Sequence, residues 1–69
     1  MNEAEVAFIH QAIGGPERFQ KLIAFAQEYA PEEVIDSFNE AVVAGNKSKV
    51  LTYLTRFSTN YIEVIGEPA

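Results

Sequence analysis

The sequence predicts an all-α fold, a small compact bundle of helices joined by short Gly/Pro turns. The expected helices cover about residues 3–13, 16–29, 31–44 and 47–64. Glycine and proline interrupt the chain at Gly14-Gly15-Pro16, Ala30-Pro31 and Gly45-Asn46. The intervals between these breaks have the lengths of ordinary helices, and the connections suit neighbouring helices in a bundle. Apolar residues within the intervals recur at helical spacing.

Length and composition restrict both fold and function. The 69 residues suffice for one small domain, residues 1–69, and are too few for two. Hydrophobic residues make up 48% and charged residues 22%, as in globular proteins, and cysteine is absent, which excludes disulfides and thiolate metal sites. The net charge of -5 argues against nonspecific nucleic-acid binding. No apolar run has the ~18–20 residues of a membrane span, so we expect neither nucleic acid nor membrane as a partner.

The first expected helix, residues 3–13, is apolar on two sides. Val6, Ile9 and Ile13 share one face, and Phe8 points nearly the opposite way. Such a helix is either sandwiched in a core or lacks a neighbour on one side. Phe8 is therefore a candidate partner-binding residue.

Pro16 marks the start of the second helix, residues 16–29, because its missing N–H would be unpaired at the first helical position. One apolar stripe follows, formed by Phe19, Leu22, Ile23 and Ala26. Pro31 ends this helix near Tyr29, since the residue before a proline avoids the α region, and it also starts the third helix.

The third helix, residues 31–44, has an apolar inner face and an acidic outside. The inner positions are Val34, Phe38, Ala41 and Val42, and the acidic residues are Glu32, Glu33, Asp36 and Glu40. These carboxylates indicate a solvated surface, because a paired-carboxylate catalytic site needs apolar walls that raise one pKa. Gly45 is the expected residue after the helix end.

The fourth helix, residues 47–64, is the longest and the most periodic, and Asn46 or Ser48 could cap it. Its apolar seam consists of Val50, Leu54, Phe57, Tyr61 and Val64. A core face is the first interpretation of this seam, and contact with a helix of another chain is the alternative. Residues 66–69 are expected as a frayed end.

Charge is unevenly distributed along the chain. Residues 1–45 hold two bases against eight acids, whereas residues 46–62 hold three bases and no acid. A second stripe on the fourth helix comprises the candidate partner-binding residues Lys49, Tyr53, Arg56 and Asn60. A basic stripe that includes an aromatic side chain suits contact with an acidic protein surface. Alternatively, these bases complement the acidic helices of the same domain.

The sequence offers little for catalysis. His10 is the one histidine, whereas a zinc site needs three or four ligands, so a partly buried structural histidine is expected. Gly14-Gly15 before a helix could hold an anion, but a tight turn is the commoner reason for two glycines. No nucleophile and base are placed together. We therefore predict a protein that is not an enzyme, with no catalytic residue, metal site or cofactor.

A set of motifs covers most of the chain. It comprises Ile13-Gly14-Gly15-Pro16-Glu17-Arg18-Phe19 with Leu22, Ala30-Pro31-Glu32, Ser37-Phe38-Asn39-Glu40-Ala41, Asn46 and Val50. Over about residues 6–62 the chain resembles the capsid assembly (internal scaffolding) proteins of short-tailed autographivirus-type phages. Members of that family are several times longer, with an acidic N-terminal portion and a basic C-terminal tail. We expect the chain to be a folded segment of such a longer scaffolding protein.

The resemblance implies a non-enzymatic role in procapsid formation. The implied partners are the major capsid protein, bound at its inner face, and a second copy of the chain. The implied locations are the host cytoplasm and the procapsid interior, with absence from the mature virion. The alternative is a small acidic phage-type helical protein that binds and modulates a host enzyme through Glu32, Glu33, Asp36 and Glu40.

Overall fold

The computed structural model describes residues 1–66, which form four α-helices and no β-strand. The helices are α1 (Glu3–Ala12), α2 (Pro16–Tyr29), α3 (Glu32–Ala44) and α4 (Lys47–Val64). The predicted all-α bundle is confirmed. The bounds of α2 and α4 are as predicted, α1 ends one residue earlier, and α3 begins one residue later because Pro31 is its N-cap. Of the expected frayed end, residues 67–69 lie outside the described residues.

The turn between α3 and α4 follows from two adjacent residues. Gly45 has a φ of 71° in the left-handed region, which glycine adopts without steric cost. The next residue, Asn46, accepts a hydrogen bond at its Oδ1 from the Lys49 N–H at 3.2 Å. Asn46 rather than Ser48 therefore caps α4.

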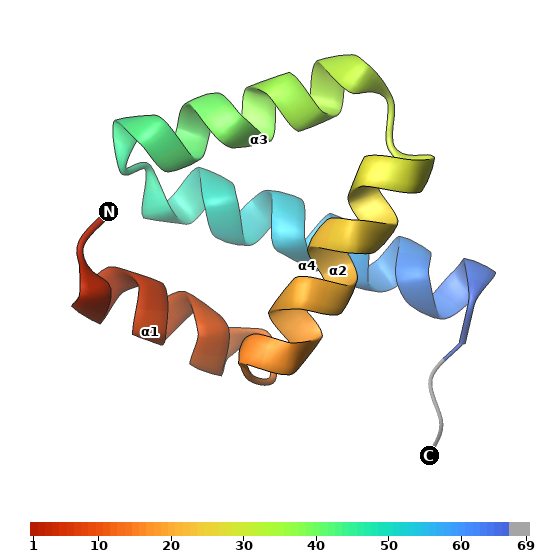
Figure 1. Cartoon of the computed structure of the whole chain (residues 1–69), viewed down its shortest axis with the longest axis horizontal. Coiled ribbons are helices and arrows are strands. Elements are labelled where there is room, and N and C mark those ends of the chain that lie inside the picture. The colour runs from red at the N-terminus through yellow and green to blue at the C-terminus, as the bar shows by residue number, and fades with distance from the viewer. Residues whose placement is uncertain (67–69) are drawn as a thin grey trace.

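The helix α4 is the central element, because it packs against each of the other three helices. Figure 1 shows α3 running beside α4, with α2 crossing α4 and α1 on the far side from α3. The Cα atoms span 31 × 27 × 15 Å, so the bundle is flat.

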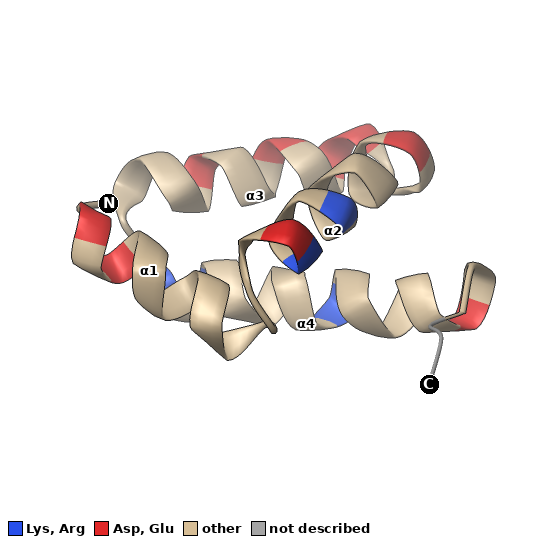
Figure 2. Cartoon of the chain, turned by 60° about the horizontal axis from the view of Figure 1, so that its bottom comes forward, with Lys and Arg blue, Asp and Glu red and all other residues tan. Residues whose placement is uncertain are grey.

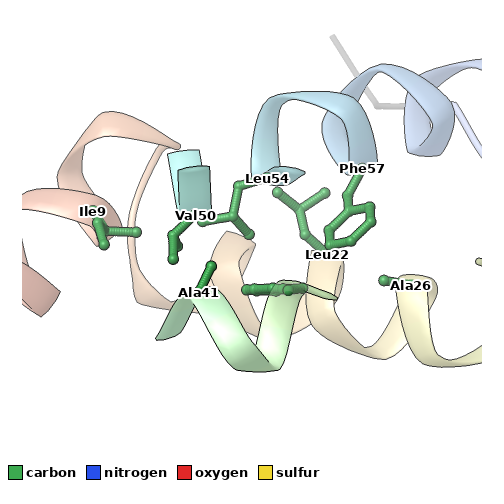
Figure 3. Close-up of a cluster of buried hydrophobic side chains, with 8 residues drawn as sticks. Ile9, Leu22, Ala26, Ala41, Val50, Leu54 and Phe57 are labelled. Atoms are coloured by element: carbon green, nitrogen blue, oxygen red, sulfur yellow. The ribbon is translucent and has the colours of Figure 1, made fainter. Parts of the chain in front are cut away.

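All four helices contribute to a wholly apolar core (Figure 3). The clustered side chains are Ile9, Leu22, Ala26, Phe38, Ala41, Val50, Leu54 and Phe57. Within residues 1–66 no polar or charged residue is buried. Burial of a large aliphatic or aromatic side chain stabilises a fold by about 1.5–3 kcal/mol, so these contacts hold the helices together.

The expected core seam of α4 ends before the helix does. Val50, Leu54 and Phe57 are buried and Tyr61 is half-buried, but Val64 is 59% exposed. The cause is length, since α4 has 18 residues against 14 in α2 and 13 in α3. Its C-terminal turns project beyond both neighbours (Figure 1). The prediction of Val64 as a core residue is therefore wrong.

Candidate protein-interaction surface

The second stripe of α4, which we call the α4 stripe, comprises Lys49, Tyr53, Arg56 and Asn60. These residues share one helix face because they are three or four positions apart. Lys49, Arg56 and Asn60 are exposed, whereas Tyr53 is half-buried. The structure therefore presents two cations and one amide to solvent along α4.

Tyr53 belongs more to the core than the sequence indicates. Its ring centroid lies 6.2 Å from that of Phe38 on α3 and 6.3 Å from that of Phe57 on α4. Aromatic rings at such separations attract one another beyond the burial of their area. Tyr53 is thus held in an aromatic cluster, and the exposed part of the α4 stripe is mainly basic and polar.

The exposed cations of the α4 stripe have no direct contact with the acidic side chains of the described helices. Across residues 1–66, neither Lys49 nor Arg56 forms an ion pair with a carboxylate. Figure 2 shows the acidic positions of α3 along its outer side, with the basic positions of α4 elsewhere. The alternative in which these bases pair within the domain therefore has no direct contact to support it.

Phe8 lies apart from most of the α4 stripe. Its side chain is 50% exposed, and the Lys47 Nζ is 4.9 Å from its ring centroid. This cation–π contact places Phe8 at the start of α4. Asn60 is thirteen residues further along, or about 20 Å at the helical rise. The five predicted residues therefore occupy two areas of the surface rather than one.

A groove that the sequence did not reveal lies beside the C-terminal half of the α4 stripe. Its volume is about 410 Å³, and it is lined by Phe25, Tyr29, Ala30, Pro31, Val34, Arg56, Phe57, Asn60 and Val64. Its lining residues are mostly apolar, and Arg56, Asn60 and Tyr29 are the ones that carry polar side-chain groups. Such a groove suits an apolar side chain that has a hydrogen-bond acceptor or an anion nearby.

The groove escaped prediction because its walls come from segments that are distant in sequence. The end of α2 and the start of α3 form one wall, and α4 forms the other. Tyr29 is 56% exposed on this wall, and its ring stacks on Phe25 with centroids 4.8 Å apart. The one available signal in the sequence was Tyr29, an aromatic residue next to the break at Ala30-Pro31. This signal does not specify which helix forms the opposite wall of the groove.

The glycine turn before α2 has no spare donors for an anion. The Gly14 N–H donates to the Gln11 carbonyl at 3.3 Å, and the Gly15 N–H donates to the His10 carbonyl at 2.6 Å. Both glycines have positive φ angles, 104° and 114°, which other residues rarely adopt. The interpretation as a tight turn is confirmed.

His10 is half-buried, and its ring centroid lies 4.6 Å from that of Phe19. This packing agrees with the predicted structural role. Throughout the described chain, no group of three or more His, Asp or Glu side chains is placed to hold a metal ion. Nor does any helix of that part combine the length and apolarity that crossing a membrane requires.

The α4 stripe and the adjoining groove both have features of a protein-binding site. They share Arg56 and Asn60, so one partner could contact both. Comparisons with models of protein families, with curated proteins and with solved structures each gave no match.

Proposed function

We propose that this domain is a non-enzymatic scaffolding module of phage capsid assembly that binds the inner face of the major capsid protein during procapsid formation. The observation that carries the proposal is the outward presentation of Lys49 and Arg56, without carboxylate partners in residues 1–66, by a domain of net charge -5. A basic surface on an otherwise acidic molecule selects an acidic protein surface rather than nucleic acid. The sequence resemblance supplies the identity of that partner.

Such contacts are individually weak, which suits an assembly factor that must later dissociate from the shell. An exposed ion pair contributes about 0.2–1 kcal/mol and is screened by physiological salt over about 8 Å. Many copies acting on one shell sum these weak contacts into stable binding. The protein would then act in the host cytoplasm, occupy the procapsid interior, and be absent from the mature virion.

Reversal of charge on the α4 stripe tests this function. The variant Lys49→Glu/Arg56→Glu is expected to keep its helix content, because both side chains are exposed, and to lower the yield of correctly sized shells in co-assembly with the major capsid protein. The matched control is Gln20→Glu/Lys21→Glu/Ala24→Glu on α2, which alters exposed residues and lowers the net charge equally. Normal shell yield and size with the α4 variant would refute the proposed surface.

A second candidate function rests on α3, whose acidic residues are all exposed on one helix (Figure 2). These residues, Glu32, Glu33, Asp36 and Glu40, would form the contact of a protein that binds and modulates a host enzyme. Affinity capture from host lysate separates the two functions. A host enzyme recovered in equal amount, and lost when the four residues are changed to amides, would favour this candidate over scaffolding.

A further inference from the structure

The face of α4 that carries Arg56 and Asn60 continues to a residue of opposite charge. Glu63 lies three positions after Asn60 and seven after Arg56, and all three side chains are exposed. Seven helical residues span about 10 Å along the axis, which is too far for a salt bridge within one helix. The face therefore presents a cation and an anion that cannot satisfy each other in the same chain.

This order of charges is self-complementary about a two-fold axis. If two α4 helices lie antiparallel with their Asn60 residues at the axis, each Arg56 faces the Glu63 of the other copy. A two-fold interface uses the same residues from both copies, so one contact is made twice. A parallel arrangement would instead place like charges together, which opposes association.

The same arrangement would cover the exposed apolar surface at the end of α4. Val64 is 59% exposed and Tyr29 is 56% exposed, and both line the groove. With Asn60 at the axis, Val64 of each copy comes to the level of Arg56 of the other, which is one of the residues that line the 410 Å³ groove. The last turns of α4 project beyond α2 and α3, so a second helix can approach them (Figure 1).

We propose that the chain forms a two-fold dimer in which the C-terminal halves of two α4 helices pair antiparallel. Arg56 of each copy binds Glu63 of the other, and Val64 of each copy enters the other's groove. This inference rests on the proposed role of α4 as a protein-binding surface and names a second copy as its partner. Because the second copy uses Arg56, the contact of the dimer with the capsid protein falls to Lys49, which is about 16 Å from Asn60 along the helix.

Sedimentation of the full chain over a range of concentrations tests the dimer. Glu63→Arg and Arg56→Glu each place like charges at both copies of the contact, and each is expected to raise the dissociation constant at least about tenfold. The double variant Arg56→Glu/Glu63→Arg restores opposite charges and is expected to restore dimerisation. The control Glu40→Arg makes the same charge change as Glu63→Arg at an exposed position of α3 and is expected to leave the dimer intact.

Two further variants separate the dimer from the scaffolding function. Val64→Ser is expected to weaken dimerisation without a change in charge, whereas Lys49→Glu is expected to weaken only capsid-protein binding. A wild-type chain that stays monomeric at about 1 mM, or a double variant no better than the single ones, would overturn the dimer. If Lys49→Glu nevertheless abolished capsid-protein binding, the proposed function would stand without the dimer.

Discussion

Arg18 in the first turns of α2 donates a hydrogen bond from its guanidinium to the hydroxyl of Ser58 on α4, at 2.6 Å. The contact joins residues that are forty positions apart and links the two crossing helices. Gly14 has a φ of 104°, which disfavours other residues, and a Cβ there would also lie 2.8 Å from the Arg18 Cδ, so the Arg18 side chain would have to shift. Gly14 and Arg18, which belong to the motif behind the family resemblance, are thus neighbours in the structure.

Replacement of Ser58 tests that contact. Ser58→Ala removes the acceptor from a charged donor and is expected to lower the free energy of unfolding by about 1–2 kcal/mol. Urea unfolding followed by far-UV circular dichroism measures this change. Thr59→Ala serves as the control, since its exposed hydroxyl donates to the Thr55 carbonyl within α4, and a change within about 0.5 kcal/mol is expected. Equal effects of the two variants would contradict a role for Ser58 in joining the helices.

Among residues 1–66, Leu54 is the most completely buried, with 0% of its surface exposed. Leu54→Ala removes apolar contacts and leaves a cavity, which costs about 2–5 kcal/mol. A core of this size supplies only about 3–5 kcal/mol in total, so most of this variant is expected to be unfolded at room temperature. Loss of helical circular dichroism and of a cooperative thermal transition would confirm it.

The control for that experiment is Val43→Ala on α3, where the side chain is 86% exposed. This variant loses little buried apolar surface, so the free energy of unfolding is expected to change by less than about 0.5 kcal/mol. A well-folded Leu54→Ala variant with unchanged stability would show that the core is not arranged around α4 as described.

Gly45 is favoured because of its backbone conformation and not because a side chain would lack space. A Cβ at this position would meet no atom within 4 Å, but the φ of 71° is unfavourable for residues other than glycine. Gly45→Ala is therefore expected to destabilise the domain by about 1–2 kcal/mol, and Gly45→Asn by less, because asparagine tolerates the left-handed region. Thermal unfolding of the two variants compares them directly, and equal midpoints would contradict this explanation.

Much of the fold could be predicted because its signals are local. Pro16 marks the start of α2 and Gly45 the end of α3, and the spacing of Leu22 and Ala26 shows which face turns inward. The exposure of Val64 could not be predicted in the same way. Its position fits the helical period, but whether a partner lies opposite depends on where α2 and α3 end in space.

In the candidate surface, too, local spacing predicted the environment of some residues, whereas the environment of others depends on how the helices pack. The exposure of Lys49 and Arg56 followed from their spacing, since residues on one helix face share its environment. The embedding of Tyr53 between Phe38 and Phe57 depends on how α3 packs on α4, which no local pattern encodes. The groove likewise exists only once the α2–α3 turn has been placed against Phe57.

The turn at Gly45 and Asn46 has a consequence for how quickly the domain is made. It joins α3 directly to α4, so the two helices can meet by closing a very short loop. Proteins dominated by such local contacts fold in microseconds to milliseconds. Each newly synthesised copy is therefore expected to reach its native form on this timescale.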